Sequence, residues 1–276
     1  MTKLLALTDI HMKPEGQTII GIDPFENFKR GLAHAIAHHP DAERVILMGD
    51  LTNSGTPEEY ARVGEIIADC PIPVTLMCGN HDQRDNLTAA FPWASTDDNG
   101  FVQDAFVYGT TRVLTTDTQF GPPFVSYAHL GQYCDKRFAW LTDQLQQAKD
   151  AGQNVALFAH HPPMKVGFAG MDQIRMRDDT RMAEVLKSAG VDVHFICGHV
   201  HRTISGSWHG HGFTVVKSTC HQMPLALENP DLSLSTPEPA AYGVILLTAD
   251  GIIAHSEDFD LAEDDVQPSA DAMPDA

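Results

Sequence analysis

The sequence has no long hydrophobic run and few basic residues. None of its apolar stretches reaches the roughly 18 residues that a membrane-spanning helix requires. The first residues lead directly into a strand-like segment without the pattern of a signal peptide, so we expect a cytoplasmic protein. Lys and Arg number 18 against 37 Asp and Glu, which gives a formal net charge of −19. Because the basic residues form no cluster, the composition argues against a nucleic acid polymer as partner.

Cysteine is also scarce. The five cysteines are an odd number without close pairing, so neither a disulfide framework nor a four-cysteine zinc site is indicated. We expect buried free thiols.

Length and composition suffice for one large globular domain, because 43% of the 276 residues are hydrophobic. We assign this domain to residues 1–259, with residues 222–241 as a cap or oligomerisation insertion that could cover a pocket or a partner subunit of a homo-oligomer. Residues 260–276 are acidic and have the composition of a disordered tail. The acidic surface does not exclude a small anionic substrate, because two bound divalent cations would set the potential inside a pocket.

The first third of the chain predicts a βαβαβ unit. Apolar runs at 3–7, 45–48 and 73–77 are the expected strands, and helical spacing predicts helices over 24–39 and from residue 57 onward. Asp23 is placed to cap the first helix, and Thr56 with Glu59 forms a capping box for the second. The strands of such a unit are parallel, so their carboxyl ends share one edge of the sheet.

The remaining chain is less regular. We expect antiparallel strands at 104–108 and 112–116, a helix capped by Asp135 that stops at Gly152, a strand at 154–158, a helix over 180–189 and a strand at 191–197. Further strands at 205–208, 213–217, 242–247 and 252–256 suggest a second, more antiparallel sheet. The Met- and Gly-rich loop 164–178 is a candidate pocket wall or lid.

Five of the apolar runs end in residues that bind metals. These motifs are Asp9-Ile10-His11, Gly49-Asp50, Gly79-Asn80-His81-Asp82, His160-His161-Pro162-Pro163 and Gly198-His199-Val200-His201. Asparagine is a poor metal ligand on its own. Beside a carboxylate shared by two cations, however, its carbonyl oxygen can complete a shell without adding charge. The pattern therefore points to two metal ions.

In this order, the five motifs resemble those of the calcineurin-like metallophosphoesterase superfamily, over about residues 3–220. The double histidine with two prolines, the Gly-Met-Asp loop that follows and Thr219-Cys220-His221-Gln222 are most similar to the bacterial branch of glycerophosphodiesterases and class III cyclic-nucleotide phosphodiesterases. The resemblance implies an α/β fold, a four-layer αββα sandwich with two mixed sheets and a small cap. It also implies two divalent ions, for which Fe, Mn and Zn are all suitable.

The resemblance distributes the ligands residue by residue. Asp9, His11 and His201 fit one ion, Asn80, His160 and His199 fit the other, and Asp50 bridges the two. A hydroxide held between the ions would attack phosphorus in line. Two dications less Asp9, Asp50 and this hydroxide leave a formal charge of about +1, which would attract a monoanionic diester.

Three further histidines are candidates for contact with the substrate. His81 follows the ligand Asn80 and cannot easily reach the same metal, so we assign it a catalytic role in contacting a phosphoryl oxygen or protonating the leaving group. Asn80 itself is a candidate substrate contact. His161 could orient His160 or line the pocket, and His221 resembles the substrate-contacting histidine of this branch.

Each candidate residue also has an ordinary structural explanation. A single His or Asp in a loop is usually structural, and the other histidines, His129 among them, are read as structural or surface residues.

We expect hydrolysis of a small phosphodiester: a glycerophosphodiester, a cyclic nucleotide or a phospholipid headgroup. A phosphomonoesterase or protein phosphatase is the second candidate, although no Arg follows Asp50. A non-catalytic scaffold is the third, although no ligand is missing.

Overall fold

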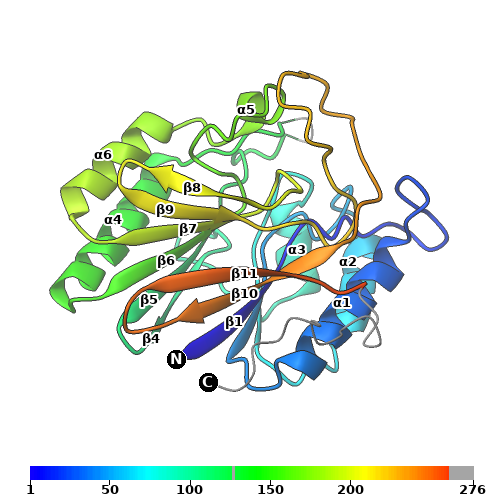
Figure 1. The fold of residues 1–276 in the computed structure, drawn as a ribbon, viewed down its shortest axis with the longest axis horizontal. Coiled ribbons are helices and arrows are strands. Elements are labelled where there is room, and N and C mark those ends of the chain that lie inside the picture. The colour runs from blue at the N-terminus through cyan, green and yellow to red at the C-terminus, as the bar shows by residue number, and fades with distance from the viewer. Residues whose placement is uncertain (126–127, 261–276) are drawn as a thin grey trace, which may run out of the picture.

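Two β-sheets lie against each other at the centre of the computed structural model, which describes residues 1–125 and 128–260 (Figure 1). The first sheet has five strands in the order β11-β10-β1-β2-β3. Its strands are β1 Thr2–Leu7, β2 Arg44–Leu47, β3 Val74–Leu76, β10 Ala241–Leu247 and β11 Ile252–Asp258. Strands β1, β2 and β3 are parallel, as predicted for the βαβαβ unit, whereas β10 runs antiparallel to both β1 and β11.

The second sheet has six strands in the order β4-β5-β6-β7-β9-β8. Its strands are β4 Asp104–Tyr108, β5 Thr111–Thr116, β6 Asn154–Ala159, β7 Val193–Cys197, β8 Ile204–Trp208 and β9 His211–Val215. Strands β5, β6, β7 and β9 are parallel, and antiparallel β4 and β8 form the two edges. The predicted hairpin of β4 and β5 is confirmed.

The grouping of the last four strands was predicted wrongly. We expect them to form a second, more antiparallel sheet, but β8 and β9 extend the six-stranded sheet, whereas β10 and β11 extend the five-stranded one. The alternation of apolar residues indicates which face of a strand is buried. It does not indicate which strand lies beside it, because that depends on contacts between residues far apart in the chain. Here β10 pairs with the free edge of β1, and β9 pairs with β7.

Six helices are described along this chain. They are α1 Pro24–His38, α2 Pro57–Ile67, α3 Arg84–Ala90, α4 Asp135–Asp150, α5 Met171–Ile174 and α6 Asp179–Ala189. The predicted caps of α1 and α2 are confirmed, since the Asp23 side chain accepts a hydrogen bond from the Phe25 N–H and the Thr56 capping box is complete. Asp135 is not the cap of α4: Cys134 occupies that position and Asp135 is the first helical residue.

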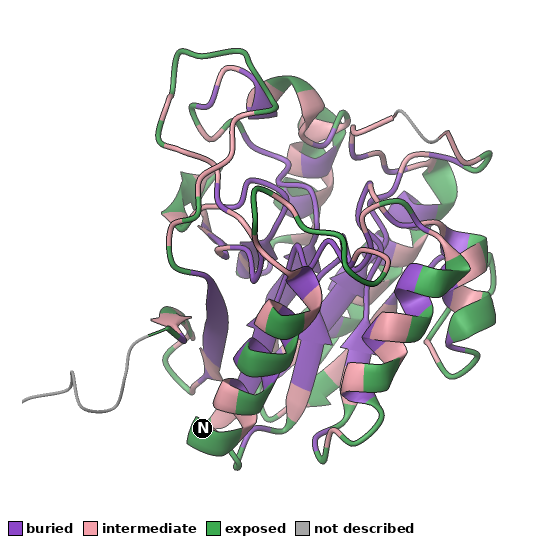
Figure 2. Ribbon diagram, turned by 90° about the vertical axis from the view of Figure 1, so that its right-hand side faces the viewer, coloured by how far each residue is buried: buried purple, intermediate pink, exposed green. Residues whose placement is uncertain are grey.

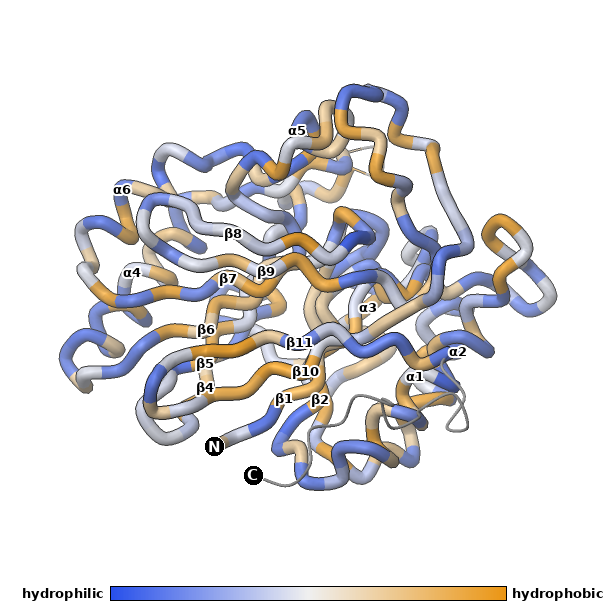
Figure 3. Tube along the Cα trace, viewed as in Figure 1, coloured by the Kyte–Doolittle hydropathy of each residue, from blue (hydrophilic) through white to orange (hydrophobic). Residues whose placement is uncertain are grey.

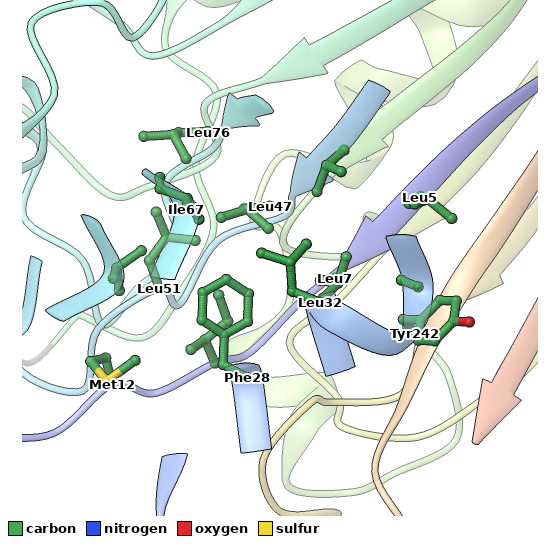
Figure 4. Packing of buried hydrophobic residues seen from close by; sticks show 14 of the residues in the cluster. Leu5, Leu7, Met12, Phe28, Leu32, Leu47, Leu51, Ile67, Leu76 and Tyr242 are labelled. Atoms are coloured by element: carbon green, nitrogen blue, oxygen red, sulfur yellow. The ribbon is translucent and has the colours of Figure 1, made fainter. Parts of the chain in front are cut away.

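The helices cover the outer faces of the sheets. Helices α1 and α2 pack on the five-stranded sheet through residues such as Phe28 and Tyr60, and Figure 4 shows Phe28 and Leu32 against Leu7 and Leu47. Helices α4 and α6 pack on the six-stranded sheet in the same way. A third apolar cluster, which includes Ile46 and Phe158, joins the sheets to each other. The predicted four-layer αββα architecture is therefore confirmed.

Burial and hydropathy follow these layers. Buried residues fill the strands and the inner helix faces, while exposed residues lie on the outer helix faces (Figure 2). The strands at the centre of Figure 3 are correspondingly hydrophobic. No helix in the described part of the chain is long and apolar enough to cross a membrane. All five cysteines are free; three are buried, and Cys70 and Cys134 are partly exposed.

Two predicted segments border the site. The loop 164–178 contains α5, and the segment between β9 and β10, orange in Figure 1, passes beside it. Backbone contact joins them, because the Ala169 N–H donates to the Leu227 carbonyl at 2.8 Å. Of the predicted acidic tail 260–276, only Asp260 lies within the described residues, and its carboxylate pairs with Arg30 at 2.8 Å. The predicted domain limits stay a prediction.

Candidate dinuclear metal centre

The loops that follow five parallel strands meet at one edge of the two sheets. Strand β1 leads to Asp9 and His11, β2 to Asp50, β3 to Asn80 and His81, β6 to His160, and β7 to His199 and His201. Every predicted ligand is at most 9% exposed. The fold thus brings together all seven side chains that the motifs singled out.

The backbone at these residues is held in an unusual conformation. Seven non-glycine residues in the described part have a positive φ, and five of them are predicted ligands: Asp9, His11, Asp50, His199 and His201, with φ between 48° and 69°. This region disfavours side chains other than those of Asn, Asp and His. Such strain persists where surrounding contacts fix it, and it is concentrated at functional sites. Here the His11 N–H donates to the Asp50 carbonyl at 2.9 Å.

One cluster gathers Asp9, His11 and His201. The Nε2 atoms of His11 and His201 are 3.0 Å apart, and His201 Nε2 lies 3.2 Å from Asp9 Oδ1. Ligands that surround a common ion at about 2.1 Å are separated by about 3 Å, so these spacings fit a metal ion. Burial, with smaller effects from neighbouring histidines, holds the pKa of His11 well below its ordinary value, which keeps its imidazole neutral and able to coordinate.

The second cluster contains three buried atoms without a hydrogen-bond partner among the described residues: Asn80 Oδ1, His160 Nε2 and His199 Nε2. Buried polar atoms are nearly always paired, so three unpaired acceptors in one site suit a cation. Burial also holds the pKa of His199 well below its ordinary value. The residues present therefore fit a second metal ion.

Asp50 lies between the two clusters. Its Oδ2 atom is 3.7 Å from His11 Nε2 and 3.4 Å from His160 Nε2, and its Oδ1 accepts a hydrogen bond from the His81 N–H at 2.8 Å. Burial raises the pKa of this carboxyl, but the neighbouring histidines, His160 and His81 foremost, together outweigh burial, so the net pKa lies well below its ordinary value. An ionised carboxylate in this position is suited to bridging two ions.

His81 sits beside the clusters and is partly exposed. Its Nδ1 donates to the Asn53 carbonyl at 2.8 Å, which leaves Nε2 as the free ring nitrogen. His81 also presents a nitrogen within 4.8 Å of His11 and Asp50 ligand atoms, so distance alone does not separate it from the ligands. Its catalytic, non-ligand role stays a prediction.

His161 and His221 lie in different environments. His161 is fully buried; its Nε2 donates to the His129 carbonyl at 3.1 Å, and its Nδ1 lies 2.7 Å from the Thr118 hydroxyl. Both ring nitrogens are therefore occupied, which favours positioning over substrate contact. His221 does line the cavity, and its carbonyl accepts from His201 Nδ1 at 2.9 Å. Burial, followed by His201, lowers the pKa of His221 to about 3.

Sequence reasoning missed His129. Its ring nitrogen Nδ1 lies 3.1 Å from Asn80 Nδ2, so the Asn80 amide donates to His129 and presents Oδ1 to the site. His129 lies in an irregular segment outside the five motifs, and no spacing in the sequence could have identified it.

Sequence reasoning also missed the structural role of Asp82. Its fully buried carboxylate accepts hydrogen bonds from the backbone N–H groups of Leu51, Thr52 and Gly79, and so ties the loop after β2 to the loop after β3. Burial, followed by repulsion from Asp50, raises its pKa to about 6. Its place in the Asn80-His81-Asp82 motif was the available signal.

Close packing around the backbone explains the three motif glycines, because a Cβ atom on Gly49 would also lie 2.7 Å from His160 Nδ1. A Cβ atom on Gly79 would clash with the Asp50 carboxylate and backbone, and one on Gly198 would clash with Thr8 and lie 2.8 Å from Asp9 Oδ2. Gly49 additionally has φ +94°, which favours glycine. A predicted ligand lies against each of the three glycines: Asp50 at Gly79, Asp9 at Gly198 and His160 at Gly49.

The clusters open into a cavity of about 360 Å³. Histidines and amides form its inner part, and apolar residues of α5 and of the β9–β10 segment form its outer part. The lining residues within the described part include no Lys or Arg.

This fold and these ligand clusters are those expected of a phosphoesterase with a dinuclear metal centre. Residues 2–203 match the model of the calcineurin-like phosphoesterase family. A probable cyclic nucleotide phosphodiesterase of Rhodopseudomonas palustris is 33% identical over 93% of this chain and 92% of its own. A probable glycerophosphodiester phosphodiesterase of Arcobacter nitrofigilis is 26% identical over 92% of each chain. The crystal structure of a dimetal phosphatase from Danio rerio has the same fold, with a TM-score of 0.71, 12% identity and coverage of 94% and 96%.

The chain belongs to the calcineurin-like phosphoesterase family. The predicted family, its bacterial diesterase branch and the hydrolase class are confirmed. The individual roles of the site residues stay predictions.

Proposed function

We propose that this protein hydrolyses a small phosphodiester. The names of its relatives support this assignment, since one is called a cyclic nucleotide phosphodiesterase and another a glycerophosphodiester phosphodiesterase. We assign one ion to Asp9, His11 and His201, the other to Asn80, His160 and His199, and the bridge to Asp50. When bound, two divalent cations would supply Lewis-acid stabilisation of the phosphoryl oxygens and a nucleophile from water at neutral pH.

The protein's own residues perform the remaining tasks. His81 keeps its Nδ1–H on the Asn53 carbonyl, and in its doubly protonated imidazolium form it can donate the Nε2 proton to the leaving alkoxide and become neutral. His129 orients the side chain of Asn80 by accepting a hydrogen bond from its amide. Asp82 holds the loop after β2 against the loop after β3. His221 lines the cavity as a neutral imidazole and can contact a substrate oxygen.

The observation that carries the choice of a diester is the absence of Lys and Arg from the described cavity lining. A monoester brings about one more negative charge than a diester near neutral pH, and guanidinium groups are the usual means of balancing it. A site whose net positive charge comes from its ions alone is better matched to a monoanion.

The test compares kcat/KM for bis-p-nitrophenyl phosphate with that for p-nitrophenyl phosphate at equal loading with Mn, Fe or Zn. We expect the diester to be preferred. A preference for the monoester would support the phosphomonoesterase alternative, and no turnover of either ester with two ions bound would support the scaffold. The same comparison between metals identifies the most active pair. Cytoplasmic location and a homo-oligomer stay predictions.

A further inference from the structure

The outer part of the cavity is apolar and comes from three separate segments. Its residues are Ile19, Met171, Ile174, Met223, Leu232 and Leu234, which we call the apolar wall. Ile19 belongs to the loop after β1, Met171 and Ile174 to α5, and the others to the segment before β10. Met164 and Phe168, from the same loop as α5, are buried in the cluster beneath α4 and α6, to which Met171 also belongs.

Contacts among these segments hold the wall in place without a ligand. Leu227 accepts the backbone hydrogen bond from Ala169 beside α5, and Gln222 and Thr236 exchange two backbone hydrogen bonds of 3.0 and 2.8 Å. A Cβ atom on Gly170 would lie 2.8 Å from a Leu232 methyl group, so the two segments are packed together here. The wall is therefore a preformed surface, and binding to it requires little ordering.

The wall offers nothing that would bind a charged group. Among the cavity residues that the structure describes, Asp50 is the only carboxylate, and it faces the metal clusters. The serines Ser233 and Ser235 are the only polar residues contributed by the segment before β10 other than His221. A cationic substituent placed here would lose water without gaining an opposite charge, which is unfavourable.

We propose that the apolar wall binds the substituent that stays on phosphorus, and that this substituent is neutral and apolar or flat, such as an aryl or heteroaromatic group. This inference rests on the proposed function, in which the leaving group lies at His81. It disfavours diesters in which a choline or ethanolamine cation would face the wall.

Three esters with the same leaving group test the proposal: methyl, phenyl and choline p-nitrophenyl phosphate. Each kcat/KM is divided by the rate constant of the same ester in hydroxide, which removes differences in intrinsic reactivity. We expect the phenyl ester to exceed the methyl ester by about 10-fold or more, since apolar contacts in a pocket discriminate on this scale. The choline ester should not exceed the methyl ester.

Wall variants locate the effect. Leu232→Ser and Ile174→Ser should each reduce the phenyl advantage several-fold and leave the methyl ester nearly unchanged. Leu225→Ser is the matched control, because Leu225 lies in the same segment, is 64% exposed and does not line the cavity. It should change neither ester.

Three outcomes would overturn the inference: equal normalised rates for the phenyl and methyl esters, a preference for the choline ester, or equal losses on both neutral esters in the wall variants. The last outcome would place the leaving group at the wall. If only p-nitrophenyl phosphate is hydrolysed and no diester is, the proposed function itself fails, and the two failures are thus distinguishable.

Discussion

At the scale of single residues, backbone carbonyls decide which nitrogen several of the site histidines present. The Nδ1 atoms of His160, His201 and His81 lie 2.8–2.9 Å from the carbonyls of Met48, His221 and Asn53, respectively. A carbonyl can only accept, so each Nδ1 carries the hydrogen and Nε2 faces the site. In His161 the arrangement is reversed, because Nε2 donates to a carbonyl.

This assignment makes a prediction for His81. In His81→Ala both ions should remain bound, because none of the assigned ligands is removed. Turnover of diesters with alkoxide leaving groups should fall by about 10²–10⁴, the usual contribution of a positioned general acid. Esters of p-nitrophenol should lose less, since that leaving group hardly needs a proton. Metal analysis and kcat on both substrate types provide the measurement, and equal losses on both would show that His81 does not protonate the leaving group.

His129 is predicted to act through Asn80. In His129→Ala the Asn80 amide loses its acceptor, and affinity for one of the two ions should fall about 10- to 100-fold, as is usual for a residue that orients a ligand. His129→Asn is the matched variant, because its side-chain oxygen can accept from Asn80 in place of Nδ1. Metal titration by calorimetry should show two ions binding normally in His129→Asn and one binding weakly in His129→Ala. Unchanged binding of both ions in His129→Ala would contradict this role.

The sequence identified residues that recur in motifs and missed those that act from outside them. All seven predicted ligands follow apolar strand segments, which are visible in the sequence. His129 acts from a loop whose position depends on the folded six-stranded sheet, and no local pattern encodes that position. Asp82 was visible, but its bonds to the loop after β2 are tertiary.

At the scale of elements, a buried ionic network joins α3, β5 and α4. Asp117 follows β5, is fully buried and accepts two hydrogen bonds from Arg84 at 2.6 and 2.8 Å. Arg137 donates to the carbonyls of Asp117 and Gln119, at 3.0 and 2.7 Å. The Gln119 side chain in turn donates to the carbonyls of Gly79, at 3.1 Å, and Asp82. The network thus supports the loop that carries Asn80 and His81.

Asp117→Ala should therefore destabilise the fold strongly. Removing the carboxylate leaves two buried guanidinium groups without their counter-charge, which typically costs about 3–5 kcal/mol. The free energy of unfolding from urea titration measures the effect. Asp41→Ala is the control, because Asp41 pairs with Lys3 at 2.6 Å but its side chain is 72% exposed, and its unfolding curve should coincide with that of the unaltered protein. Coincident curves for Asp117→Ala would show that the network adds no stability.

Elements were predicted better than their pairing. Helices α1 and α2 followed from apolar spacing together with Asp23 and Thr56, both of which act locally. The partners of β8 to β11 depend on contacts between residues far apart in the chain, such as Leu5 opposite Val244. Periodicity contains no information about such contacts. The four-layer order came from the family resemblance rather than from the pattern of residues.

At the scale of the whole molecule, the candidate metal centre joins the two halves of the sandwich. Four predicted ligands, Asp9, His11, Asp50 and Asn80, follow strands of the five-stranded sheet, and three, His160, His199 and His201, follow strands of the six-stranded sheet. Elsewhere the sheets meet through the apolar cluster that includes Ile46 and Phe158. Ions held between these ligands would link the sheets at their carboxyl edge and would bind only the folded chain.

Metal removal should therefore lower the melting temperature. A ligand that binds only the native state stabilises it by about 2.7 kcal/mol at 100 times its Kd. For a chain of this size, that corresponds to a shift of about 5 °C for each ion. Scanning calorimetry of the protein with a chelator and with increasing Mn²⁺ measures this shift, which should grow with the logarithm of the free metal concentration. Asp50→Ala, which removes the proposed bridge, should lose most of the response to metal. If that variant gains as much stability from Mn²⁺ as the unaltered protein does, Asp50 does not bridge the ions.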